Sequence, residues 1–238
     1  MLPINSLTKI SLVLPCFNPP ENWEKVVVQT VLDLISKNHV FIELILVNDG
    51  STNGVTKEHI NYLKDHLDNF IYVDCSKNSG KGAALRAGVK KASEELVIYT
   101  DIDFPYTKES LLSILNKLNE GNDIALGHRG ENYYTKTPFV RKYVSKLLRW
   151  SLKTFLRLPT DDSQCGIKGF NSKGATIFLD TQIDRFLFDL EFIKLASKSD
   201  CKIVISEVVL KPNVVFSKVN LKILSREALN FIKVLFRK

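Results

Sequence analysis

Residues 95–106 read ELVIYTDIDFPY, a short apolar run that leads into two aspartates and a Phe-Pro-Tyr turn. Two earlier stretches follow the same plan, because an apolar run leads into a polar turn in TKISLVLPCFNPPE at 8–21 and in IELILVNDGST at 42–52. A fourth apolar run lies at 69–75. Short runs rich in Val, Ile and Leu predict strands that are buried on both faces.

Segments long enough for helices separate these runs, at 21–37, 54–67 and 80–93. Alternation of strand and helix predicts right-handed crossovers, and therefore an α/β fold with a mainly parallel sheet and helices on both faces. Further along the chain we expect a series of elements: a helix at 108–119, a strand at 122–127, a basic helix at about 138–157, a polar loop TDDSQCGIKGF at 160–170, a helix near 186–198 and a strand pair near 202–211.

The composition is that of an ordinary globular protein, with 45% hydrophobic and 25% charged residues among 238, which excludes a disordered or collagen-like chain. The four cysteines lack Cys-x-x-Cys spacing, so neither a zinc ribbon nor a disulfide framework is expected. We expect one domain at 1–212 and a basic amphipathic helix in the tail at 213–238. There is no signal-peptide pattern and no apolar window of about 18 residues, which favours a cytoplasmic location.

The acidic turns lie where a parallel sheet binds its ligands, beyond the carboxyl ends of the strands. In an extended segment, Asp101 and Asp103 lie on the same side and can share a divalent cation that also binds a diphosphate, although helix capping is the simpler alternative. Asp49 either accepts hydrogen bonds from a nucleotide or only stabilises a turn. The stretch NSGKG at 78–82 lacks the spacing of a P-loop or of a dinucleotide fingerprint, so neither class is expected.

Taken together, five stretches resemble, in order and spacing, the motifs of the family 2 glycosyltransferases, which have the Rossmann-like GT-A fold: LVLPCFNPPE, LVNDGST, NSGKGAALRAG, YTDIDFPY and DDSQCGIKGF. With FDLEFIKLA after them, they look most like the branch that makes polyprenyl- or dolichyl-phosphate sugars, especially the dolichyl-phosphate β-glucosyltransferase type. The resemblance covers roughly residues 8–210. Two departures are Asn48, where the family commonly has an acid, and Pro19-Pro20 within the common Asn-Glu-Glu.

The resemblance implies an inverting, metal-dependent enzyme that moves a hexose from a nucleotide sugar, with UDP-glucose as the expected donor, to a polyprenyl phosphate. It implies that Mg²⁺ or Mn²⁺ binds to Asp101 and Asp103. The implied donor-binding residues are Pro15, Phe17, Asp49, Lys81 and Asp101. The implied contacts to the acceptor phosphate are Arg129, Arg141 and Lys168. The implied catalytic residues are Asp162 and Gln164, in a stretch near the reacting sugar, and Asp189, in the Phe-Asp-x-Glu stretch. The alternatives are that Lys81 and Lys168 are solvated surface charges and that Asp189 only caps or pairs on a helix.

Two basic amphipathic segments are a separate feature of the chain. Residues 136–157 hold seven Lys or Arg and no acid, and residues 211–238 hold seven against the single acid Glu227. A helix packed on the core with a solvated charged face explains either segment, but the pair favours contact with an anionic membrane surface or a membrane-spanning partner. We therefore expect a peripheral protein on the inner face of the membrane. No helix-turn-helix, zinc-finger or RNP pattern occurs, so a nucleic acid partner is not expected.

Two other functions stay open at this point. One is a family 2 glycosyltransferase that acts on a saccharide hydroxyl, which would need a general base such as Asp162 or Asp189. The other is a basic module that binds a membrane or a nucleic acid and has no activity.

Overall fold

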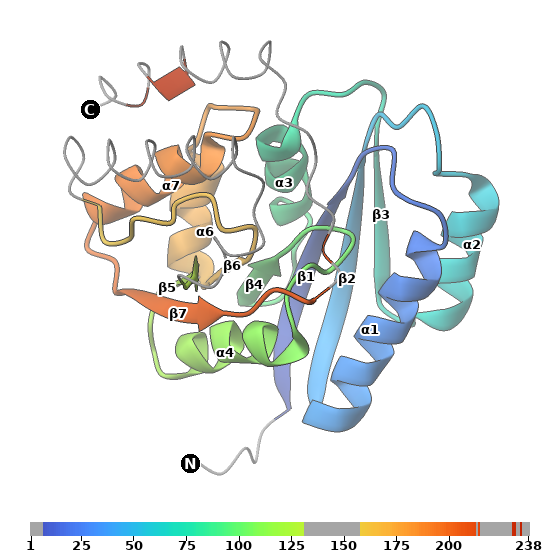
Figure 1. Ribbon diagram of the computed structural model, residues 1–238, viewed down its shortest axis with the longest axis horizontal. Helices are drawn as coiled ribbons and strands as arrows, with labels where there is room; N and C mark the ends of the chain where they lie inside the picture. Colours follow the sequence, from blue (N-terminus) through green and yellow to red (C-terminus); the bar gives the residue numbers. More distant parts are fainter. Residues whose placement is uncertain (1–6, 131–157, 213, 215–229, 232–233, 235–238) are drawn as a thin grey trace.

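The computed structural model describes residues 7–130, 158–212, 214, 230–231 and 234. Its centre is a 7-stranded sheet with the strand order β3-β2-β1-β4-β6-β5-β7 (Figure 1). The strands are β1 (Thr8–Cys16), β2 (Val40–Asp49), β3 (Phe70–Cys75), β4 (Leu96–Tyr99), β5 (Ile124–Arg129), β6 (Lys168–Phe170) and β7 (Ile203–Val208). The predicted mainly parallel sheet is confirmed, because only β6 runs antiparallel to its neighbours, β4 and β5.

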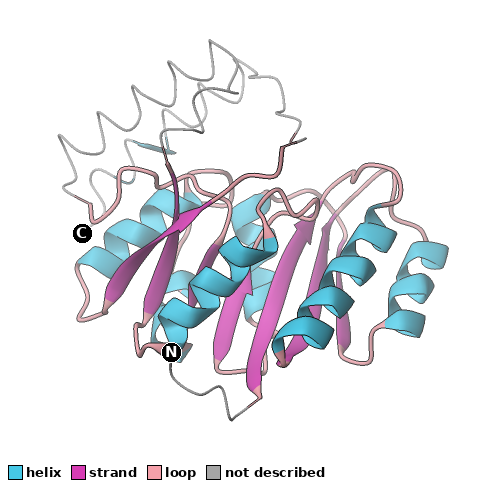
Figure 2. Cartoon of the chain, turned by 60° about the horizontal axis from the view of Figure 1, so that its bottom comes forward, coloured by secondary structure: helices cyan, strands magenta, loops and turns pink. Residues whose placement is uncertain are grey.

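Helices cover both faces of the sheet (Figure 2). The helices are α1 (Trp23–Asn38), α2 (Lys57–His66), α3 (Lys81–Val89), α4 (Lys108–Asn119), α6 (Ser172–Leu179) and α7 (Phe188–Ser197). One apolar core joins the sheet to α1, α2 and α4, through residues such as Val27, Leu63 and Ile114. A second core joins the opposite face to α3, α6 and α7, through residues such as Leu85 and Phe178. The long apolar runs of β1 and β2 are explained by this burial on both faces.

The expected helices at 21–37, 54–67, 80–93, 108–119 and 186–198 are confirmed, with small changes at their ends. The expected strand pair near 202–211 is wrong, because only β7 forms there and Leu210 makes an isolated bridge to Tyr106. The expected loop at 160–170 is wrong at its end, where β6 forms because it pairs with β4 and β5 together. Helix α6 was not expected, although Asn171 caps it by accepting hydrogen bonds from the backbone N–H groups of Lys173 and Gly174.

The expected basic helix at 138–157 lies outside the described residues, as does nearly all of the tail at 213–238. Among the helices that the structure describes, none combines the length and the apolar character needed to cross a bilayer.

The strand order places one crevice at the centre of the sheet. The chain runs from β1 to β2 and β3 on one side and then returns to form β4 on the other side of β1. The order therefore reverses between β1 and β4, and ligands of such sheets bind outside the carboxyl ends of the strands at this point. The segments that follow Cys16 and Tyr99 lie at this edge.

Candidate active site

Asp101 and Asp103 follow β4 at the crevice. Asp101 is half-buried and its Oδ1 accepts a hydrogen bond from Lys81 Nζ at 2.5 Å. A Cβ atom on Gly166 would lie 2.5 Å from Asp101 Oδ2, so the absence of a side chain there keeps the space beside this oxygen open. Asp103 is exposed. The pair therefore offers carboxylate oxygens at the edge where the fold binds its ligands.

The electrostatics of this pair fit a divalent cation. Although Asp103 is exposed at the surface, partial desolvation by the surrounding protein raises the pKa of its carboxyl group, and the neighbouring carboxylate of Asp101 raises it further. Burial alone would lower the pKa of Lys81, but Asp101 and Asp189 outweigh that effect and the pKa is raised. Mg²⁺ and Mn²⁺ prefer hard oxygen ligands such as carboxylates. Either cation would also relieve the repulsion between the two aspartates.

The protein supplies only part of a coordination sphere for such a cation. No group of three His, Cys, Asp or Glu side chains able to hold a metal occurs in the part of the chain that the structure describes. The remaining ligands of a cation between Asp101 and Asp103 would therefore be oxygens of a substrate or water.

Asp49, at the end of β2, holds the neighbouring loop in place. Its carboxylate accepts hydrogen bonds from the backbone N–H groups of Ser79 at 2.8 Å and Gly80 at 2.9 Å, and from Asn78 Nδ2 at 3.1 Å. Each carboxylate oxygen has more than one lone pair, so these bonds do not exhaust its capacity. A contact between Asp49 and a nucleotide stays a prediction.

The glycines at 80 and 82 serve close packing in this structure. A Cβ on Gly80 would lie 2.5 Å from the carbonyl oxygen of Asp184, and a Cβ on Gly82 would lie 2.5 Å from that of Ile183. The Asp184 carbonyl accepts hydrogen bonds from the backbone N–H groups of Gly82 at 2.7 Å and Ala83 at 3.2 Å. The segment at 181–185 therefore covers the first turn of α3. This close packing explains why Gly80 and Gly82 are glycines, although their loop lacks the spacing of a phosphate-binding motif.

Lys168 and Asp189 form a buried ion pair. Lys168 Nζ donates to Asp189 Oδ1 at 2.7 Å, to the Cys165 carbonyl at 2.6 Å and to the Ser163 carbonyl at 3.1 Å. The side chain of Lys168 is fully buried, so the alternative of a solvated surface charge is wrong. The hydroxyl of Tyr99 donates to the same Asp189 oxygen. An ammonium group has three donors, so Lys168 would have to leave these acceptors to contact a phosphate.

Arg129 and Asp162 form a second buried pair. Arg129 Nε donates to Asp162 Oδ2 at 2.9 Å, Arg129 Nη2 donates to Asp162 Oδ1 at 2.6 Å, and the Arg129 backbone N–H also donates to Oδ2. This two-pronged geometry joins the end of β5 to the segment at 160–170. Both carboxylate oxygens of Asp162 are therefore engaged by a cation.

Gln164 and Ser163 lie between these pairs and carry unsatisfied polar atoms. Gln164 Nε2 and Ser163 Oγ are buried and have no hydrogen-bond partner among the residues that the structure describes. Buried polar groups in folded proteins nearly always have partners, which include bound ligands and water. This segment is therefore suited to contact a polar group of a substrate, as predicted for Gln164.

At the end of β1, Pro15 is half-buried and the next residue but one, Phe17, is 48% exposed. Their place beside a nucleoside stays a prediction. Arg141 lies outside the described residues. The structure thus brings predicted residues from the ends of β1 and β2, from the segment after β4, from β6 and from α7 to one edge of the sheet. Several of the predicted cations there already have protein partners.

Lys211 is a residue near this edge that the sequence reasoning missed. Its backbone N–H donates to the Pro105 carbonyl at 2.8 Å, and its Nζ lies 6.0 Å from the centroid of the Phe104 ring. Burial lowers the pKa of Lys211, against the attraction of Asp103. The single Leu210–Tyr106 bridge, which brings Lys211 here, leaves no periodic signal in the sequence.

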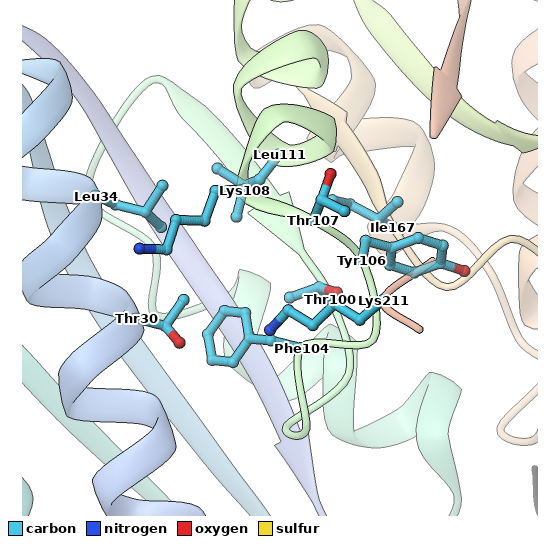
Figure 3. A pocket seen from close by; sticks show the side chains of 10 residues that line it. All are labelled: Thr30, Leu34, Thr100, Phe104, Tyr106, Thr107, Lys108, Leu111, Ile167 and Lys211. Carbon is cyan, nitrogen blue, oxygen red and sulfur yellow. The ribbon is translucent and has the colours of Figure 1, made fainter. Parts of the chain in front are cut away.

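Lys211 also lines a small pocket on the α1 and α4 side of the loop that follows β4 (Figure 3). Thr30 and Leu34 come from α1, and Lys108 and Leu111 come from α4. The pocket has room for about one water molecule. It is therefore not a site for a nucleotide.

Comparisons with known proteins agree with this geometry. The family model described as Glycosyl transferase family 2 matches residues 11–178. A dolichyl-phosphate beta-glucosyltransferase of Trichomonas vaginalis is 29% identical over 206 residues, which cover 82% of this chain and 63% of that protein. The chain thus spans less than two thirds of the length of this relative.

Two solved structures have a similar fold. Mannosyl-3-phosphoglycerate synthase from Rubrobacter xylanophilus has a TM-score of 0.67 at 14% identity, over 96% of this chain and 72% of that one. Glucosyl-3-phosphoglycerate synthase from Mycobacterium tuberculosis, solved with Mn²⁺, UDP and glucosyl-3-phosphoglycerate, has a TM-score of 0.61 at 16% identity, over 96% of this chain and 78% of that one. These likenesses confirm the predicted GT-A fold.

Proposed function

Because the chain belongs to glycosyl transferase family 2, we propose that it transfers glucose from UDP-glucose to the phosphate of a polyprenyl phosphate, with inversion at the anomeric carbon. The observation that carries the proposal is the edge formed by Asp101, Asp103 and Lys81 at the reversal of strand order. The similarity to a dolichyl-phosphate beta-glucosyltransferase supports the choice of sugar and acceptor.

For the donor, Asp101 and Asp103 would hold Mg²⁺ or Mn²⁺, which neutralises charge on the departing diphosphate when bound. The solved relative that contains UDP and Mn²⁺ supports this cofactor. Lys81 fixes the orientation of Asp101 and adds positive potential beside it. Pro15, Phe17 and Asp49 would line the nucleoside, at the ends of β1 and β2.

For the acceptor, an oxygen of the phosphate attacks the anomeric carbon while the bond from that carbon to the diphosphate breaks and UDP leaves. A phosphate monoester has a second pKa of about 6, so it is largely dianionic at neutral pH and needs no general base. A saccharide hydroxyl would need one. Both oxygens of Asp162 accept from Arg129, and Asp189 Oδ1 accepts from Lys168, which favours the phosphate acceptor over the hydroxyl.

The side chains around the acceptor would then act through position and charge. Gln164, whose buried Nε2 has no partner in the described part of the chain, would donate to the sugar or to the attacking phosphate. Arg129 and Lys168 would act through position, because they hold Asp162 and Asp189 in place in their buried pairs. Direct binding of the acceptor phosphate by Arg141 is proposed from the family resemblance alone.

A transfer assay tests this function. The purified chain is incubated with Mn²⁺, a radiolabelled nucleotide sugar and undecaprenyl or dolichyl phosphate, with UDP-glucose, UDP-galactose and GDP-mannose compared. We expect label from UDP-glucose in the lipid fraction as a glucosyl phosphate, and none in excess chelator. Transfer to a saccharide alone would contradict the acceptor, preference for GDP-mannose would contradict the donor, and no turnover of any sugar would favour a binding module.

We also propose that the enzyme works at the inner face of a membrane, since a polyprenyl acceptor stays in the bilayer. The basic amphipathic segments at 136–157 and 213–238 support this, because Lys and Arg side chains are attracted to anionic lipid. A membrane-spanning partner protein is the competing explanation. Sedimentation with vesicles separates the two, because direct lipid binding weakens at high salt and with neutral lipid.

A further inference from the structure

Arg185 is a half-buried arginine in the segment between α6 and α7, next to the candidate active site. Four other cations of this region have carboxylate partners: Lys81, Arg86, Arg129 and Lys168. Within the described part of the chain, the guanidinium group of Arg185 has neither a hydrogen bond nor an ion pair. Half-burial of an unpaired guanidinium carries a desolvation cost that a bound anion would offset.

The backbone that carries Arg185 is held firmly. Glu191 Oε2 accepts hydrogen bonds from the backbone N–H groups of Gln182 and Ile183, both at 2.8 Å. Arg86 donates to the Ile183 carbonyl at 2.9 Å and forms an ion pair with Asp184. The carbonyl of Asp184 accepts from the first turn of α3. Arg185 therefore starts from a fixed position, and ligand binding would not have to order its backbone.

The side chain of Arg185 begins beside Gly80, in the loop that links two parts of the candidate active site. Its Cγ lies 3.0 Å from the position that a Cβ would take on Gly80, and Gly80 has a φ of +112°. The N–H of Gly80 donates to Asp49, on the proposed nucleoside side. The next residue, Lys81, pairs with Asp101 on the proposed metal side. In a nucleotide sugar, the diphosphate joins the nucleoside to the sugar and is also the group that binds the metal, so it would lie beside this loop.

We propose that Arg185 binds the diphosphate of the nucleotide-sugar donor. This inference rests on the proposed function and adds a residue to it. Arginine suits the task because its planar guanidinium group offers two parallel N–H donors to phosphate oxygens, which lysine does not. The proposal also agrees with Gly80 and Gly82, since their lack of side chains allows the segment that carries Arg185 to pack against the loop at 78–82.

The test compares ligands that differ only in their phosphates. Uridine, UMP and UDP are titrated calorimetrically, each with Mn²⁺, into the full-length wild type, Arg185→Ala, Arg185→Lys and Lys77→Ala. Lys77 is the matched control, because it is an exposed cation just before the same loop. We expect Arg185→Ala to weaken UDP binding by about 10- to 100-fold, the range for a hydrogen bond between charged groups, with uridine binding unchanged. Arg185→Lys should recover only part of this loss, and Lys77→Ala should change UDP binding by less than about 3-fold.

Each other outcome has a defined meaning. Equal UDP affinities for wild type and Arg185→Ala would overturn the inference while the proposed function stands. An equal loss for uridine and UDP, or a loss for Lys77→Ala as large as for Arg185→Ala, would also overturn it, since the effect would then come from structure or from general charge. If Arg185→Ala binds UDP normally but raises the KM for the acceptor phosphate, Arg185 serves the acceptor and the inference is wrong. Failure of the wild type to bind any nucleotide would instead count against the proposed function.

Discussion

Replacement of Lys168 by Met separates a structural role of this lysine from direct binding of a substrate phosphate. The substitution keeps most of the aliphatic length and removes the ammonium group. Three acceptors then lose their donor: Asp189 Oδ1 and the carbonyl oxygens of Ser163 and Cys165. Asp189 is only 4% exposed, so its carboxylate would remain in the interior with the Tyr99 hydroxyl as its nearest donor.

The expected cost is large because one charge of a buried pair is left behind. Such a loss typically destabilises a protein by about 3–5 kcal/mol. Whole domains are stable by only about 5–15 kcal/mol. For a chain of this size the unfolding temperature should fall by about 6–20 °C. The double variant Lys168→Met with Asp189→Asn should recover part of this loss, because it removes the stranded charge.

Urea unfolding followed by circular dichroism measures these differences. Lys91→Met is the matched control, since Lys91 is exposed and the same substitution there should cost less than about 0.5 kcal/mol. If Lys168→Met unfolds within about 1 kcal/mol of wild type and only raises the acceptor KM, the buried pair is not structural and Lys168 binds substrate directly. Failure of the double variant to recover any stability would contradict the charge argument.

Three further predictions concern the metal site, the α3 loop and the tail. Asp103→Asn should leave the unfolding temperature equal to that of wild type or higher, because it relieves carboxylate repulsion. The same substitution should lower the rate of sugar transfer by at least ~100-fold. A loss of stability would refute this reasoning. Gly82→Ala, whose Cβ would lie 2.5 Å from the Ile183 carbonyl, should lower the free energy of unfolding in urea by about 1–3 kcal/mol. Gly130→Ala should not, since no described atom lies within 4 Å of its Cβ position, and equal effects would refute the packing argument. Removal of residues 217–238 should weaken binding to anionic vesicles, measured by sedimentation, by about 1 kcal/mol for each Lys or Arg that contacts lipid. No change in binding would favour a partner protein.

The parallel part of the fold was predictable because its strands are buried on both faces and therefore read as unbroken apolar runs. Strand β6 was not, since its three residues include a lysine and a glycine and its pairing depends on β4 and β5. Helix α6 carries a readable signal in its Asn171 cap, which the polar composition around it concealed.

The place of the candidate site was predictable from the polar turns after the strands, but the partners of its charges were not. Lys168 and Asp189 are 21 positions apart, and Arg129 and Asp162 are 33 apart, so their pairing depends on how β5, β6 and α7 meet. The position of a Lys or Arg in a sequence does not reveal whether the folded protein pairs its side chain with a carboxylate. Arg185 was missed for the same reason, because its lack of a partner is visible only once the other pairs are formed.

Binding of Mn²⁺ in the presence and absence of UDP tests the central claim, that Asp101 and Asp103 bind the donor diphosphate through a divalent cation. Because the protein offers two carboxylates and a substrate must complete the coordination, cation and nucleotide should raise each other's affinity by the same factor. Titration followed by the electron paramagnetic resonance signal of free Mn²⁺ should show weak binding alone, much tighter binding with UDP, and loss of this gain in Asp103→Ala. Equal Mn²⁺ binding with and without UDP, or an Asp103→Ala protein that behaves as wild type, would contradict the account.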